Sequence, residues 1–186
     1  STFKFLRLIS LILVIIALAR PQVIDTSTRV KTNSGIDIIM AIDVSASMLA
    51  KDLKPNRIDA LKNVADEFIK IRVSDRIGLV EYAGESYTKT PLTSDKNITL
   101  RSLREIKYNN IIEGGTAIGM GLATSVNRIK DSKAKSKVII LLTDGVNNAG
   151  FIDPITAAEL AKEFQIKIYS IGLGTNGLAL SPVGID

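Results

Sequence analysis

The chain has 186 residues, of which 46% are hydrophobic and 5% aromatic, and a formal charge of +5. The excess positive charge lies in residues 1–31, which contain five basic residues and one acidic residue, so the remaining 19 basic and 18 acidic residues nearly balance and do not favour nucleic-acid binding. Because cysteine and histidine are absent, disulfides, thiolate chemistry, the usual zinc sites and a Ser-His-Asp hydrolase are excluded, and only oxygen ligands remain for a metal ion.

Residues 1–20 form an apolar segment that carries no charge between Arg7 and Arg20. A helix over its uncharged part reaches about 18 Å, and one that begins at Phe3 reaches roughly 25 Å, against about 30 Å of membrane hydrocarbon. We expect a transmembrane or membrane-anchor helix at residues 1–20. Two alternatives stay open, a signal peptide that ends near Ala19 and an apolar helix that packs on a partner.

The next segment, residues 21–34, is polar and rich in β-branched residues, which is typical of a stem or linker. We expect residues 35–186 to form one globular domain, with alternating strands and helices. Short apolar runs predict strands at residues 36–44, 76–84, 136–145 and 166–174, and residues 86–93 predict a short antiparallel edge strand. Helical spacing of apolar residues predicts helices within residues 53–72, 97–106, 114–130 and 153–164.

Two details support the predicted helices. Asn56 is a plausible cap for the first of them, and Pro154 suits the first turn of the last. The apolar positions of the first helix predict a core-facing side; they are Ile58, Leu61, Val64, Ala65, Phe68 and Ile69.

Strands separated by helices of this length predict an α/β fold, a doubly wound and mostly parallel sheet with helices on both faces. The short antiparallel strand is expected at one edge, and the apolar N-terminal helix precedes the domain. In such a sheet, ligands bind at the carboxyl ends of the strands, where the strand order reverses.

Oxygen-bearing side chains follow the predicted strands at this edge. Asp43 and Asp144 each end a strand, Ser45 and Ser47 follow the first, and Thr116 lies in the loop "EGGT". Two carboxylates and three hydroxyls are hard ligands that suit Mg²⁺ or Mn²⁺, with some coordination positions left to water. The two carboxylates cancel the charge of the ion, and the neutral hydroxyls fill further positions without adding negative charge, so such a site should accept one more carboxylate from outside.

Each motif alone has an ordinary structural explanation. Aspartate and serine after a strand are common capping and turn residues, Asp-Gly is a common turn, and two glycines before a helix can be a flexible cap. The glycine-rich stretch at residues 172–177 matches a dinucleotide-binding pattern, but no helix or suitably spaced acidic residue follows it. The motifs gain weight from their joint occurrence at strand ends.

The series "DVSAS", "GGT" and "TDG" resembles the metal-ion-dependent adhesion site of von Willebrand factor A domains. The resemblance covers roughly residues 35–174 and implies metal ligands at Asp43, Ser45, Ser47, Thr116 and Asp144. It implies a divalent cation, Mg²⁺ first with Mn²⁺ or Ca²⁺ as alternatives, and a protein partner that completes the coordination shell with a Glu or Asp carboxylate. Such domains normally close with another helix after the last strand, and we expect residues 35–186 to lack that helix.

The segments "ALARPQ", "GGTAIGMGLATSVNRIK" and "LLTDGVNNAGFIDPITAAELAKE" are similar to BatA-type proteins of the bacterial aerotolerance operon. This resemblance implies a protein of the bacterial inner membrane with its domain on the periplasmic side, and partners among other Bat-type proteins and a MoxR-type ATPase system. It implies a binding domain with no catalytic residues and a role in stress or oxygen tolerance.

Two other function classes stay open. A Mg²⁺-dependent phosphotransferase could use Asp43 as its nucleophile, but Ser45 stands where such an enzyme usually has a second acid, and no lysine is obviously placed as a charge clamp. A purely structural domain with a vacant site is the third class, and the complete ligand set argues against it.

Overall fold

The structure is a computed structural model that describes residues 2–19, 35–108 and 114–175. It divides into two units, residues 1–32 and 33–186, which are described separately. In the first unit, α1 (Thr2–Ala19) is a single α-helix. Among the described residues, no helix is long and apolar enough to cross a membrane. The predicted anchor at residues 1–20 therefore stays a prediction, and the predicted linker at 21–34 lies outside the described residues.

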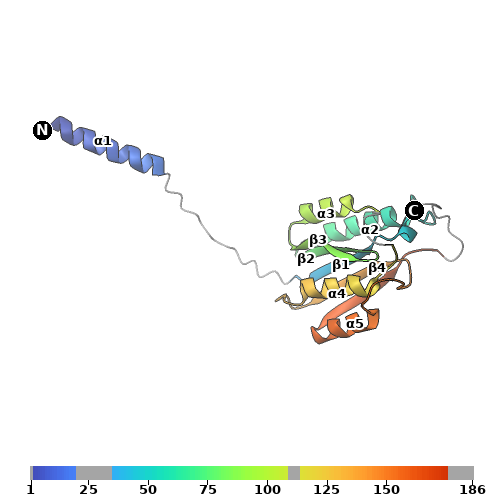
Figure 1. Cartoon of the computed structure of the whole chain (residues 1–186). Helices are drawn as coiled ribbons and strands as arrows, with labels where there is room; N and C mark the ends of the chain where they lie inside the picture. Colours follow the sequence, from blue (N-terminus) through green and yellow to red (C-terminus); the bar gives the residue numbers. More distant parts are fainter. Residues whose placement is uncertain (1, 20–34, 109–113, 176–186) are drawn as a thin grey trace. The chain divides into compact units, whose positions relative to one another are not determined.

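The second unit is built on a five-stranded sheet with the order β3-β2-β1-β4-β5 (Figure 1). The strands are β1 (Asp37–Asp43), β2 (Arg76–Tyr82), β3 (Ser86–Thr93), β4 (Lys137–Thr143) and β5 (Ile166–Gly172). Only β3, at one edge, is antiparallel to its neighbour. The predicted fold class and the edge strand are confirmed.

Helices cover both faces of the sheet (Figure 1). On one side lie α2 (Arg57–Ile71) and α3 (Lys96–Glu105), and on the other α4 (Ile118–Ile129) and α5 (Pro154–Glu163). A short 3₁₀ helix, η1 (Ala46–Leu49), follows β1 and was not predicted. Asn56 caps α2 and Pro154 begins α5, as expected.

The central strand β1 is apolar on both faces because each face meets helices. Its residues alternate between two clusters, with Met40 and Ile42 facing α2 and Ile39 and Ala41 facing α4. The apolar side of α2 faces the sheet as predicted, and Val64 on that side lines an apolar cavity, where it is 70% exposed.

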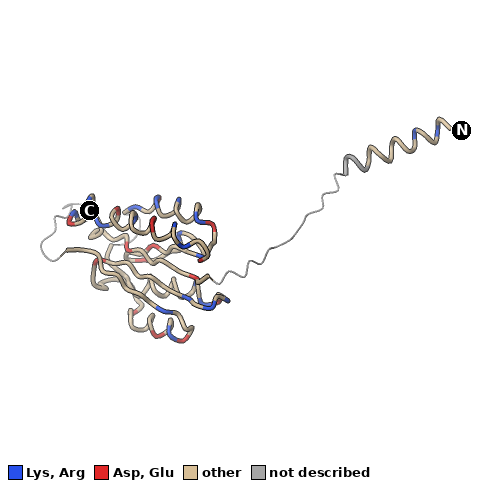
Figure 2. Tube along the Cα trace, turned by 180° about the vertical axis from the view of Figure 1, so that it is seen from behind, with Lys and Arg blue, Asp and Glu red and all other residues tan. Residues whose placement is uncertain are grey.

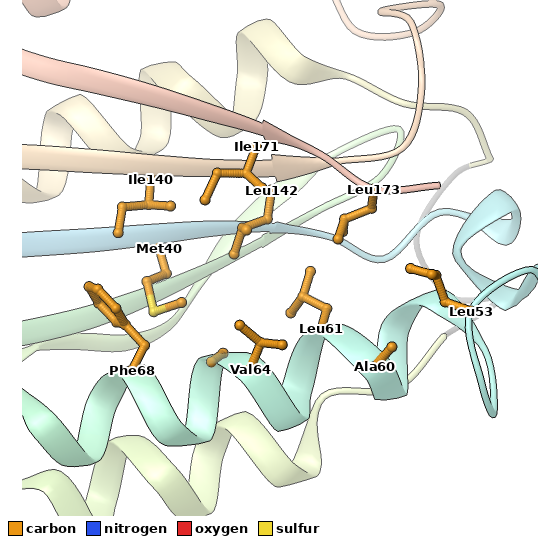
Figure 3. Close-up of a pocket in the computed structure, with 11 residues that line it drawn as sticks. Met40, Leu53, Ala60, Leu61, Val64, Phe68, Ile140, Leu142, Ile171 and Leu173 are labelled. Carbon is orange, nitrogen blue, oxygen red and sulfur yellow. The ribbon is translucent and has the colours of Figure 1, made fainter. Parts of the chain in front are cut away.

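This cavity has a volume of about 330 Å³ and lies between α2 and the sheet (Figure 3). In Figure 3 the side chains of Leu61 and Val64 point from α2 toward those of Ile140 and Ile171 on the strands. Because all its lining residues are apolar, the cavity provides no ligands for an ion.

Basic and acidic residues are interspersed along the helices of this unit (Figure 2). On the outer side, Asp66 pairs with both Lys70 and Arg104. The helices of this unit that Figure 2 shows thus carry charges of both signs.

Candidate metal centre

The site begins with Asp43, the last residue of β1. Its neighbours in the sheet are β2 and β4, so the carboxyl ends of three parallel strands meet here. Asp43 is fully buried: its Oδ1 accepts the backbone N–H of Ser45 at 2.9 Å, and its Oδ2 accepts the hydroxyl of Thr143 at 2.9 Å. Burial raises the pKa of Asp43 above its usual value, although the hydrogen bonds from Ser45 and Thr143 oppose that shift.

The two serines connect Asp43 to Asp144. Ser45 leaves β1 in extended conformation at the start of η1, and the tight turns of η1 keep Ser47 close to it. The two hydroxyl oxygens lie 2.9 Å apart, and the Ser47 hydroxyl donates to Oδ1 of Asp144 at 2.7 Å. Ser45 is buried while Ser47 is exposed, so Ser47 marks the mouth of the site.

Thr116 reaches the site from the loop before α4. Its backbone N–H donates to the side-chain oxygen of Asn148 at 2.7 Å, and its carbonyl accepts the backbone N–H of Asn148 at 3.0 Å. Gly115 before it has a φ of +103°, and an added Cβ there would lie 2.6 Å from the Cβ of Ala149. A Cβ at Gly145 would lie 3.8 Å from Thr116 Oγ1, so this hydroxyl lies beside the Asp144–Gly145 turn.

Arg57, the first residue of α2, is an unpredicted member of the site. Its Nη1 donates to Oδ2 of Asp144 at 2.6 Å. Its Nε and Nη2 donate to the two carboxylate oxygens of Asp52, each at 2.8 Å. The hydrogen bond with Arg57 holds the pKa of Asp52 well below its usual range, and the same contact raises the pKa of Arg57.

The floor of the site is closely packed. Tyr82, the last residue of β2, is fully buried, and its hydroxyl donates to the carbonyl oxygen of Leu142 at 3.1 Å. Burial raises the pKa of Tyr82, with Asp43 as the next cause. Gly121 in α4 allows this packing, because a Cβ there would lie 2.7 Å from the Tyr82 ring.

The structure brings all five predicted residues together, since hydrogen bonds connect Asp43, the serines and Asp144, and Thr116 lies at the adjoining turn. It adds Thr143, Asn148 and Arg57. Thr143 is the first residue of the "TDG" motif and Asn148 follows that motif by three residues, so both were within reach of sequence reasoning. Arg57 was not, because it belongs to none of the motifs at the strand ends and begins a helix 87 residues before Asp144.

The donor set fits a hard divalent cation. It contains two carboxylates and three hydroxyls, all oxygen ligands of the kind that Mg²⁺ accepts. In the part of the chain that the structure describes, no cluster of three or more acidic residues could hold a metal ion. The hydroxyls are therefore essential to the donor set, and the carboxylates alone would not form a site.

A family model for the von Willebrand factor type A domain matches residues 37–179. The chain belongs to this family. An uncharacterized protein of Borreliella burgdorferi is 34% identical over 176 residues, which are 94% of this chain and 51% of that protein. The chain thus spans about half the length of the curated relatives it matches.

Solved structures show the same fold in membrane proteins. An aerotolerance-related membrane protein of Bacteroides fragilis matches with a TM-score of 0.74 and 28% identity, over 82% of this chain and 74% of that one. The BatB protein of Bacteroides thetaiotaomicron matches with a TM-score of 0.69 and 31% identity, over 74% and 66%. The resemblance to aerotolerance-related proteins is confirmed.

Another solved structure of similar fold contains a bound metal ion. Proximal thread matrix protein 1 from the mussel byssus, described with a zinc-occupied MIDAS motif, matches with a TM-score of 0.65 and 26% identity, over 74% of this chain and 35% of that one. A domain of this fold therefore holds a divalent metal in at least one relative.

Proposed function

We propose that this chain is a divalent-cation-dependent protein-binding domain. The observation that carries the proposal is the environment of Asp43. Its carboxylate is fully buried, and among the described residues no lysine or arginine pairs with it. A buried carboxylate without a cation is costly, and a bound divalent ion would remove that cost.

The five predicted residues would hold the ion, Asp43 and Asp144 through carboxylate oxygens and Ser45, Ser47 and Thr116 through hydroxyls. When bound, the ion supplies an open coordination position for a carboxylate of the partner. Asn148 orients Thr116, and Thr143 orients Asp43. Ser47, which is exposed, places this position at the surface.

The ion we propose is Mg²⁺, with Mn²⁺ and Ca²⁺ as alternatives, since all three accept oxygen ligands. Three of the five donors are neutral hydroxyls. Because the carboxylates only balance the charge of the ion, a further anionic ligand can still bind with favourable charge pairing.

Titration calorimetry on the metal-free chain tests this proposal, with Mg²⁺, Mn²⁺, Ca²⁺ and Zn²⁺ in parallel. A glutamate-containing peptide and its glutamine counterpart then serve as probes. We expect cation binding, and peptide binding that needs both the cation and the glutamate. Asp43→Ala should abolish both. Binding of the glutamate peptide that persists in excess chelator would contradict the mechanism.

A phosphotransferase that uses Asp43 as nucleophile is less well supported. Ser45 stands two residues after Asp43, where such an enzyme usually has a second acid. The one cation that contacts the site among the described residues is Arg57, and it binds Asp144. Incubation with Mg²⁺ and acetyl phosphate, followed by peptide mass spectrometry, decides the matter, because a phosphoryl group on Asp43 would establish the enzyme.

We also propose that the protein acts at the bacterial inner membrane, attached through residues 1–20, with the domain on the periplasmic side. The support is the apolar N-terminal segment and the aerotolerance-related membrane protein among the structural neighbours. Partners among other Bat-type proteins and a MoxR-type ATPase system are proposed on the same resemblance. Fractionation of cells that express the full-length protein, with and without residues 1–20, tests the attachment.

A further inference from the structure

We propose that Arg57 is a positioning residue of the metal centre that favours capture of an anionic partner over tight retention of the cation. The inference rests on the proposed function. Arg57 binds one oxygen of Asp144, so that oxygen is not available to the cation. Its guanidinium also places a positive charge beside the position where an outside carboxylate would bind.

The contact with Asp144 divides the two oxygens of that carboxylate. Oδ2 accepts Nη1 of Arg57 at 2.6 Å, and Oδ1 accepts the hydroxyl of Ser47 at 2.7 Å. The Asp144 side chain has no exposed surface. Only Oδ1 therefore faces the serines. The guanidinium partly neutralises the Asp144 carboxylate and so weakens its attraction for a bound cation.

Helix stability does not explain the position of Arg57. A positive side chain at the first residue of a helix is unfavourable, because the N-terminal end of the helix dipole is itself positive. Here the guanidinium instead turns toward two acidic groups outside the helix, and its side chain is only 14% exposed. The position of this guanidinium next to Asp144 is therefore slightly unfavourable for the stability of α2.

The guanidinium is also held firmly in place. Asp52 binds it through both oxygens, at 2.8 Å each, and Oδ2 of Asp52 accepts the backbone N–H of Thr175 at 2.9 Å. Gly174, with a φ of +142°, lets the chain pass close by, since a Cβ there would lie 3.1 Å from Nη2 of Arg57. An exposed, loosely paired arginine would lack these contacts.

The charge of Arg57 should have opposite effects on the affinity for the cation and on the affinity for an anionic partner. Arg57 repels the cation and attracts a carboxylate, so its loss should strengthen cation binding and weaken anion binding. Loss of the charge of Asp52 should do the reverse. A residue that merely supported the loop would weaken both when removed, which makes the signs diagnostic.

The test compares Arg57→Gln, Arg57→Lys and Asp52→Asn with the wild-type chain. Arg76→Gln is the matched control, since Arg76 pairs with the buried Asp37 at the opposite end of the sheet. Mn²⁺ affinity is measured by electron paramagnetic resonance. Affinity for the glutamate-containing peptide is measured by calorimetry at saturating Mn²⁺, and exchange of the Thr175 amide hydrogen is measured in the metal-free protein.

For Arg57→Gln we expect Mn²⁺ affinity to rise about fivefold, peptide affinity to fall about tenfold, and the Thr175 amide to exchange faster. Arg57→Lys should keep most of the peptide affinity because it keeps the charge. Asp52→Asn should show the reverse signs, which keeps the inference testable if Arg57→Gln does not fold. Arg76→Gln should leave both affinities unchanged.

The outcomes separate this inference from the proposed function. If Arg57→Gln lowers both affinities together, or leaves both unchanged, the inference is wrong while the metal-dependent site stands. If the wild-type chain binds no Mn²⁺ at all, the proposed function fails and this inference fails with it.

Discussion

The hydroxyl of Thr143 donates to Oδ2 of Asp43 at 2.9 Å, across 100 residues of sequence. Both residues end strands that lie side by side, β1 and β4, so the sheet itself creates the contact. Thr143→Val removes the donor and leaves a buried carboxylate oxygen with one partner fewer. We expect a loss of about 1–3 kcal/mol in the free energy of unfolding of the metal-free protein, measured by urea denaturation.

Thr143→Ser is the matched control, because it keeps the hydroxyl and removes only a methyl group. It should retain most of the stability that Thr143→Val loses. Equal losses in the two variants would show that packing of the methyl group, and not the hydrogen bond to Asp43, stabilises this strand end.

Ser47 allows ligand loss to be separated from unfolding. Its hydroxyl contacts Ser45 and Asp144, yet the residue is exposed. Ser47→Ala removes the hydroxyl that donates to Oδ1 of Asp144, so it should lower the free energy of unfolding of the metal-free chain by about 1 kcal/mol and leave the domain folded. Its Mn²⁺ affinity should fall at least tenfold by electron paramagnetic resonance, and unchanged affinity would remove Ser47 from the ligand set.

The fold and the five proposed ligands could be predicted from sequence because both depend on local patterns. The apolar run ending in Asp43 and the serines two and four residues later are read within one strand and its loop. A doubly wound sheet then brings the strand ends together. Side-chain pairings such as Arg57 with Asp144 follow only from the angle at which α2 leaves its loop, which no spacing rule encodes.

The exposure of Val64 could not be predicted from its helical spacing. That spacing places Val64 on the apolar side of α2, where it lines an apolar cavity between α2 and the sheet and is 70% exposed (Figure 3). Periodicity predicts which side of a helix is apolar. It does not predict whether neighbouring elements fill the space beside that side.

Gly119 controls how closely α4 approaches the loop that follows Asp144. A Cβ at this position would lie 1.9 Å from the carbonyl oxygen of Ile152, a backbone atom that no rotamer change can move. Gly119→Ala should therefore displace the loop and lower the free energy of unfolding by about 1–3 kcal/mol. Gly172→Ala is the control, because a Cβ there meets nothing within 4 Å. Equal stability of the two variants, measured by thermal denaturation, would contradict this account.

The environment of Glu81 predicts that the stability of the folded protein depends on pH, whether or not a metal ion is bound. The side chain of Glu81 is buried on β2. Among the residues that the structure describes, its Oε1 has no hydrogen-bond partner, and Lys89 forms an ion pair with this oxygen at 3.6 Å. Burial raises the pKa of Glu81, and the attraction of Lys89 only partly opposes this shift. The folded protein thus binds a proton at Glu81 more readily than the unfolded chain, so this residue lowers stability as pH rises above the ordinary pKa of glutamate, about 4.3.

Glu81→Gln keeps the size of the side chain and removes the charge. In metal-free protein it should be more stable than the wild type at pH 7, and the difference should shrink as the pH is lowered toward 4, where protonation of the wild-type carboxyl becomes substantial in the unfolded chain as well as in the folded protein. Glu159→Gln, on the exposed side of α5, should show no such trend. Urea denaturation from pH 4 to pH 8 measures both variants. A variant that is less stable than the wild type at every pH would mean that the pairing with Lys89 outweighs the cost of burial.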